Sequence, residues 1–162
     1  MKKKFTKKNI LFALVALLIV FQFFRIDKTN KTSAPEKDIL AMTVPGPEIS
    51  SILKNSCYDC HSNFVTYPWY TNIAPVSWWI KHHINEGSHH LNFSEWGNYP
   101  SRKADHKLKE CVEMIEEDEM PMTSYTLMHK GSKLNKDQKT LLINWFNSMR
   151  THESDKPKEN KQ

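Results

Sequence analysis

The chain has few of the features that mark β-rich or nucleic-acid-binding proteins. It holds only four glycines in 162 residues, and no segment alternates apolar and polar side chains strongly enough to predict a strand. An all-α fold is therefore expected. Positive charge is also local, because the first 30 residues carry seven Lys or Arg and one Asp, whereas the whole chain has a net charge of +5. The remainder is nearly neutral, so we expect no nucleic-acid partner.

The N-terminus has the pattern of a signal anchor. Five lysines precede an apolar run over 10–24, which is short against the roughly 20 residues of a spanning helix, and Arg25 closes the run. No small-x-small cleavage site follows closely. We therefore predict a cytoplasmic basic segment at 1–8 and a transmembrane helix at 9–26. The expected location is the bacterial inner membrane, single-pass, with the rest facing the periplasm; a cleaved periplasmic form is the alternative.

The rest of the chain reads as one small domain between two polar segments. Residues 27–46 are polar with two prolines and predict a tether, and 151–162 are charged and predict a disordered tail. Between them, helical spacing is present at 47–55, 75–87, 102–119 and 135–149. Long loops are expected in between, notably at 58–74 and 91–101. Asn135 and Gln138 resemble a capping box, and Gly87 is a plausible C-cap. The domain at 47–150 is thus expected to be helical.

The motif with the clearest chemistry is Cys57-Tyr58-Asp59-Cys60-His61. This C-x-x-C-H pattern is the attachment motif of c-type haem. Its two thiols add across the two vinyl groups of the porphyrin, and the adjacent histidine is then placed on one haem face to bind iron. We therefore predict one covalent haem c at Cys57 and Cys60, with His61 as the proximal iron ligand.

Three other interpretations of the motif remain open. A zinc site at Cys57 and Cys60 needs two further ligands, and no second C-x-x-C or H-x-x-x-H pair is present. A thioredoxin-like redox pair requires a βαβ context that a helical chain lacks. A structural disulfide between the two cysteines would close a tight loop and leave His61 without a role. Cys111 lies on the apolar stripe of the 102–119 segment and is expected to be a buried free thiol.

The chain resembles a family of small bacterial haem-binding domain proteins, exported or membrane-anchored, with one c-type haem. The resemblance rests on NSCYDCHSN at 55–63, YPWYTNIAPVSWWIKHHINEG at 67–87, LNFSEW at 91–96, the Met120-Pro121 pair, and the spacing of Tyr125 and His129. It covers a little over half of the chain. It implies a cytochrome c-like helical fold with one haem but no settled physiological function. Lys130 departs from the family, where proline often follows the histidine.

A sixth iron ligand is needed if the haem is to shuttle electrons. Met120 is the first candidate, because it ends the 102–119 segment and Pro121 fixes the chain that follows. Met122 is a near neighbour that could replace it. Among the histidines, His83 is the candidate because it lies on an apolar stripe, and His129 is expected to form hydrogen bonds within the fold instead.

Aromatic residues are dense around the motif, and Trp69 and Trp79 are the ones predicted to line a haem crevice. The function we expect is electron transfer with His/Met ligation, between the haem and a periplasmic or membrane redox partner. A haem enzyme or sensor with an open sixth position is the alternative, although no distal His-Arg pair suited to peroxidase chemistry is evident.

Overall fold

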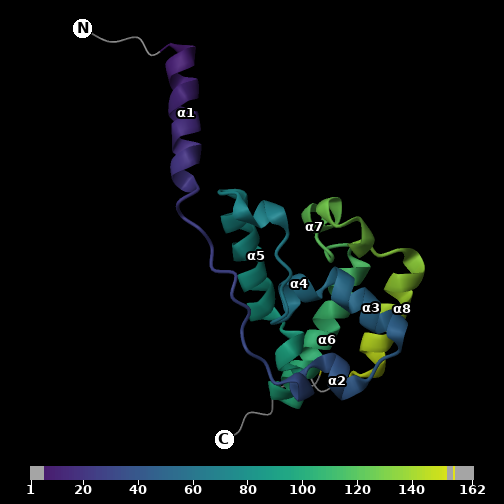
Figure 1. The fold of residues 1–162 in the computed structure, drawn as a ribbon. Coiled ribbons are helices and arrows are strands. Elements are labelled where there is room, and N and C mark those ends of the chain that lie inside the picture. The colour runs from purple at the N-terminus through teal and green to yellow at the C-terminus, as the bar shows by residue number, and fades with distance from the viewer. Residues whose placement is uncertain (1–5, 153–154, 156–162) are drawn as a thin grey trace, which may run out of the picture.

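The computed structural model describes residues 6–152 and residue 155, and all secondary structure in that part of the chain is helical (Figure 1). The elements in chain order are α1 (Lys7–Phe21), η1 (Pro35–Lys37), α2 (Ile39–Thr43), α3 (Pro47–Ser56), α4 (Tyr58–His61), η2 (Trp69–Asn72), α5 (Val76–His90), η3 (Phe93–Asn98), α6 (Ser101–Glu116), α7 (Thr123–Met128), η4 (Lys130–Ser132) and α8 (Lys136–Ser148). The two stretches predicted as long loops, 58–74 and 91–101, thus contain the short elements α4, η2 and η3.

The core lies where α6 and α8 pack against each other and against α3. From α6 it takes Leu108, Val112 and Ile115, and from α8 it takes Leu142 and Phe146, all of them buried. Residues three and four apart share one face of a helix, so this spacing produces a continuous apolar stripe on each. These are the stripes that the sequence predicts.

The start of α8 is fixed by its capping box. The Asn135 side chain accepts the backbone N–H of Gln138 at 2.8 Å, and the Gln138 side chain accepts the backbone N–H of Asn135 at 3.0 Å. Two backbone donors that a helix start would leave without partners are thereby satisfied. The predicted capping box is confirmed.

Part of the segment predicted as a tether folds onto the domain. Within 27–46, residues 35–43 form η1 and α2, and Ile39 is 0% exposed in the core. Asp38 caps α2 by accepting the backbone N–H of Leu40, and it also accepts the Tyr58 hydroxyl at 2.7 Å. The described chain before α3 therefore contributes to the same core as the helices after it.

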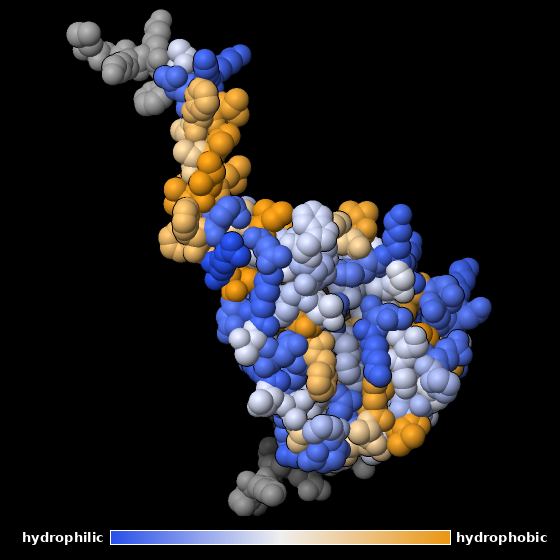
Figure 2. Space-filling view, in the orientation of Figure 1, coloured by the Kyte–Doolittle hydropathy of each residue, from blue (hydrophilic) through white to orange (hydrophobic). Residues whose placement is uncertain are grey.

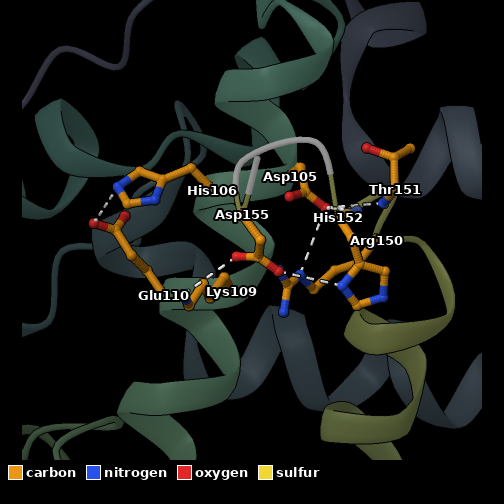
Figure 3. A network of polar contacts seen from close by, with 8 residues as sticks. All are labelled: Asp105, His106, Lys109, Glu110, Arg150, Thr151, His152 and Asp155. Atoms are coloured by element: carbon orange, nitrogen blue, oxygen red, sulfur yellow. Dashed lines mark hydrogen bonds and ion pairs between the residues drawn. The ribbon is translucent and has the colours of Figure 1, made fainter. Parts of the chain in front are cut away.

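A buried carboxylate ties the chain after α8 to α6 (Figure 3). Asp105 is only 2% exposed and accepts the backbone N–H groups of Thr151 and His152 at 2.8 and 2.9 Å. The guanidinium of Arg150 lies 3.5 Å from the same carboxylate and 2.6 Å from Asp155. The end of the described chain is thus held by charge-assisted hydrogen bonds at one residue of α6.

Helix α1 stands apart from the domain, and its surface is apolar over most of its length (Figure 2). It ends at Phe21, whose ring meets the Trp78 ring edge-on at 5.1 Å. The Gln22 side chain then accepts the backbone N–H of Ala74 and donates to the Ala74 carbonyl. These contacts connect the end of α1 to the start of α5.

The predicted transmembrane helix is wrong. Helix α1 has 15 residues, which at 1.5 Å per residue is about 22 Å, whereas the hydrocarbon core of a bilayer is about 30 Å thick. Among residues 6–152, no helix combines the length and the apolar content that crossing a membrane requires. The predicted single-pass inner-membrane location, which depended on a spanning helix, is corrected with it.

Two further predictions concern the ends of the chain. Of the basic segment predicted at 1–8, residues 1–5 lie outside the described part, and of the charged tail predicted at 151–162, only residues 151, 152 and 155 lie within it.

Candidate functional site

Both motif cysteines and the histidine lie on one helical turn. Cys57 links the end of α3 to the start of α4, and its carbonyl accepts the N–H groups of Cys60 at 3.2 Å and His61 at 2.9 Å. Cys57, Cys60 and Cys111 are all free thiols. The turn therefore presents two thiols and one imidazole from a single short element.

This turn is fixed to the core by its second residue. The buried Tyr58 ring stacks on Phe93 with centroids 5.6 Å apart, and its hydroxyl donates to Asp38. The Ser62 hydroxyl donates to the Tyr58 carbonyl at 2.7 Å, which closes the turn after His61. The motif is thus part of a rigid, packed region.

The His61 ring is oriented by two backbone carbonyls. Its Nδ1 lies 3.0 Å from the Gly87 oxygen and 3.2 Å from the Leu91 oxygen. A carbonyl only accepts, so Nδ1 carries the proton and the lone pair belongs to Nε2, the nitrogen that would bind a metal. Burial lowers the pKa of His61, against the opposing effect of these two carbonyls. The imidazole is therefore neutral at pH 7, which is the form that ligates iron.

Close contact between α4 and α5 depends on Gly87. A Cβ at this position would lie 2.8 Å from the Cys60 carbonyl oxygen and 3.1 Å from the Cys60 Cβ. The sequence predicts Gly87 as the end of a helix, but α5 continues to His90. Glycine is needed here because a side chain would push the motif turn away from the carbonyl that orients His61. Sequence reasoning missed this role.

A cavity of about 370 Å³ opens beside the motif, between α4, η2, α5 and α7. Its wall is largely aromatic and aliphatic and contains Cys60. Both predicted crevice residues are on this wall, where Trp69 is 71% exposed and Trp79 is 49% exposed. Ligand pockets in proteins commonly have volumes of about 300–1,000 Å³ and apolar walls. The size and apolar wall of this cavity suit a flat apolar cofactor.

Of the methionines near the motif, some line the cavity and one does not. Met120, the first candidate from the sequence, is half-buried and is not among the residues that form the wall. Its backbone N–H donates to the Met114 carbonyl at 3.1 Å. Met122 and Met128 do line the cavity. The structure thus brings Met122 to the same wall as Cys60.

Two histidines also lie on the wall. The Nδ1 of His83 lies 2.8 Å from the Trp79 carbonyl, within α5. The Nε2 of His129 lies 3.1 Å from the Tyr70 hydroxyl, and its Nδ1 lies 3.2 Å from the Tyr125 carbonyl. Both ring nitrogens of His129 are therefore engaged within the fold.

The cavity wall also contains a carboxylate that sequence reasoning missed. The Tyr125 hydroxyl donates to Asp59 at 2.8 Å, across 66 positions of the chain. The Tyr125 ring stacks on the His129 ring with centroids 4.1 Å apart. The spacing of Tyr125 and His129 in the sequence predicts this ring contact, because residues four apart lie on one face of a helix. It does not predict the hydrogen bond from Tyr125 to Asp59.

The motif thiols are held in their neutral form. Burial raises the pKa of Cys57 to about 12 and that of Cys60 to about 11. Electrostatic repulsion adds to the effect of burial, because Cys60 raises the pKa of Cys57 and the Asp59 carboxylate raises the pKa of Cys60. Both side chains are therefore thiols rather than thiolates at neutral pH.

Of the motif donors, Cys60 lies on the wall of the apolar cavity, whereas Cys57 and His61 share its turn but are not among the residues that line the cavity. Two thiols and an imidazole on one helical turn are the donor set of the class of small haem proteins. A direct comparison gives the family. The model of a family described as "Haem-binding domain" matches residues 16–148, which is most of the chain. The chain belongs to this haem-binding domain family. No curated protein and no solved structure matches it significantly.

Proposed function

We propose that the chain binds one c-type haem covalently through Cys57 and Cys60, with His61 as an axial ligand of the iron. The observation that carries this proposal is the geometry of His61, whose Nδ1 is bonded to two carbonyls on the turn that presents both thiols. Each thiol would add across one vinyl group, with sulfur on one carbon and hydrogen on the other. Bound haem supplies a one-electron change at iron.

The residues of the chain would bind, orient and shield this cofactor. The Gly87 and Leu91 carbonyls hold the His61 ring and keep its Nε2 available. Hydrogen bonds of this kind raise the basicity of a ligating imidazole and fix its orientation. The apolar wall between α5 and α7 would exclude water from one face. We infer that the protein transfers electrons to and from a redox partner.

Electron transfer without ligand exchange requires a second axial ligand, and we propose a methionine from the segment 120–122. Met120 is the prediction from the sequence, and the presence of Met122 on the cavity wall supports its neighbour. Two matched variants separate them. If Met120 is the ligand, Met120→Ala loses the methionine-to-iron charge-transfer band and Met122→Ala keeps it. If Met122 is the ligand, the result is reversed. Retention of the band in both variants would exclude this segment.

The central claim is tested with the three cysteines of the chain. The full-length protein is produced together with a haem-attachment system and extracted with acid acetone. Haem is expected to stay on the wild-type protein and on Cys111→Ala, because Cys111 packs on the apolar face of α6 outside the motif. It is expected to leave a variant in which both Cys57 and Cys60 are alanine. Complete extraction of haem from the wild-type protein would contradict the proposal.

A haem enzyme or gas sensor is the second candidate. The hydrogen-bonded pair of His129 and Tyr70 on the cavity wall favours it, because an acid–base group beside an open iron position is what peroxide or gas chemistry uses. Absorption spectra with and without carbon monoxide discriminate the two. A low-spin spectrum that is unaffected by carbon monoxide supports electron transfer, and a high-spin spectrum that shifts supports the enzyme or sensor.

A further inference from the structure

Asp59 bonds two parts of the cavity wall to the motif turn. One carboxylate oxygen accepts the backbone N–H of Thr66 at 3.0 Å, in the stretch that leads to η2. The other accepts the Tyr125 hydroxyl of α7 at 2.8 Å. Asp59 is the second of the two residues between Cys57 and Cys60, so these bonds start from within the motif itself.

Tyr125 is half-buried and has few ways to satisfy its hydroxyl. The same hydroxyl lies 3.2 Å from the Asn55 carbonyl, at the end of α3, so both of its partners belong to the motif region. Burial raises the pKa of Tyr125, and the hydrogen bond to Asp59 adds to the shift, so the phenol keeps the proton that it donates. A phenol bonded to a carboxylate is a charge-assisted and therefore strong contact.

The position of α7 decides where the segment 120–122 lies. Met122 is the N-cap of α7, and its carbonyl accepts the N–H groups of Tyr125 and Thr126, both at 3.0 Å. Tyr125 is therefore rigidly connected to Met122 through the first turn of the helix. Movement of Tyr125 away from Asp59 would carry Met122 away from the wall that holds Cys60.

A second contact braces α7 on its other side. The His129 ring stacks on Tyr125, and its Nε2 pairs with the Tyr70 hydroxyl of η2. The Tyr70 ring meets the same imidazole edge-on at 6.2 Å. Asp59 is thus one of several attachments of α7, and it is the one that leads directly to the motif.

We propose that Asp59 is a positioning residue, whose carboxylate holds α7 over the cavity and thereby keeps the segment 120–122 in reach of the sixth position of the iron. This inference rests on the proposed function. In this proposal the two residues between the cysteines have different roles. Tyr58 packs the motif turn into the core, and Asp59 supports the side of the haem opposite His61. Loss of the contact opens the sixth position without removing the haem.

The test measures carbon monoxide binding to the reduced, haem-loaded, full-length protein. Tyr125→Phe removes the donated proton and keeps the ring, Asp59→Ala removes the acceptor, and a double variant removes both. Asp59→Asn keeps an oxygen that accepts the hydroxyl. The matched control is Tyr67→Phe, because the Tyr67 hydroxyl bonds Lys81 and Tyr67 is not on the cavity wall. Acid-acetone extraction and circular dichroism establish haem attachment and folding for each protein.

Carbon monoxide is expected to bind about tenfold or more faster to Tyr125→Phe and to Asp59→Ala, as the loss of one hydrogen bond to a charged group implies. The double variant should match the single ones, because the two changes remove the same contact. Asp59→Asn should lie nearer to wild type, and Tyr67→Phe should equal it. The reduction potential is expected to fall in the variants that bind carbon monoxide faster.

The outcomes separate this inference from the proposed function. Attached haem in all proteins with wild-type carbon monoxide rates in Tyr125→Phe and Asp59→Ala would refute the role of Asp59 alone. A fast rate in Asp59→Ala with a wild-type rate in Tyr125→Phe would also refute it, because the effect would then come from the Thr66 contact. Haem that is fully extracted from the wild-type protein would instead refute the proposed function.

Discussion

Substitution of Gly87 by alanine is the sharpest test of how the motif turn is held. In a free helix this change would stabilise by about 1 kcal/mol. Here the new Cβ lies 2.8 Å from the Cys60 carbonyl oxygen, whereas ordinary contact begins at 3.4 Å. The three nearest atoms are the carbonyl oxygen, the carbonyl carbon and the Cβ of Cys60, so no side chain can rotate away. Overpacking of this kind costs about 1–3 kcal/mol, and the net expected loss is about 0–2 kcal/mol.

The same displacement should be visible at the haem. Movement of α4 away from α5 lengthens the His61 Nδ1 contact to the Gly87 carbonyl, now 3.0 Å, and a weaker bond there makes the imidazole less basic. The assays are urea unfolding of the haem-loaded protein and potentiometric titration of its iron. Gly131→Ala is the control, because nothing lies within 4 Å of a Cβ at that position. A Gly87→Ala protein with the stability and potential of Gly131→Ala would refute the reasoning.

Three further predictions test the fold and the thiols. Asp105→Asn should destabilise the protein by about 1.5–3 kcal/mol in urea unfolding, because it removes the charge from a buried acceptor of two backbone N–H groups, whereas Asp155→Asn, whose side chain is 38% exposed, should have a much smaller effect. Asn135→Ala should cost about 1 kcal/mol in the same assay through loss of the cap; an unchanged midpoint would contradict this. Alkylation of Cys57 and Cys60 in the haem-free protein should be slow at pH 8 and still rise above pH 9, because pKa values of about 12 and about 11 keep the thiolate fraction small. A plateau near pH 9 would show ordinary thiols.

The sequence predicts best those features that depend on neighbours along the chain. The stripes of α6 and α8 follow from residues three and four apart, and the capping box of α8 follows from Asn135 and Gln138 alone. Family membership could likewise be predicted from contiguous blocks such as 67–87, and the match over 16–148 confirms it. In each case the relevant information lies within a few turns of one helix.

The errors come from features that the local pattern does not determine. The apolar run at 10–24 predicts a spanning helix, but the helix stops at Phe21, where Gln22 bonds to Ala74, 52 positions away. Glycine is common at helix ends, yet Gly87 lies inside α5, where Cys60 of α4 approaches it closely. A polar stretch with prolines predicts a tether, but Ile39 within it fills the core. Each outcome is set by a contact with a distant part of the chain.

The two faces of the proposed haem differ in the same way. The proximal face is encoded by five consecutive residues, because Cys57, Cys60 and His61 are brought together by one helical turn. The opposite face would depend on α7, which is joined to the motif turn by a hydrogen bond between residues 66 positions apart. Sequence spacing alone therefore favours Met120, while the cavity wall contains Met122. Which of these methionines reaches the iron should depend on how firmly Asp59 holds Tyr125. The charge-transfer band of Met120→Ala and of Met122→Ala should therefore be measured with Asp59 intact and with Asp59→Ala.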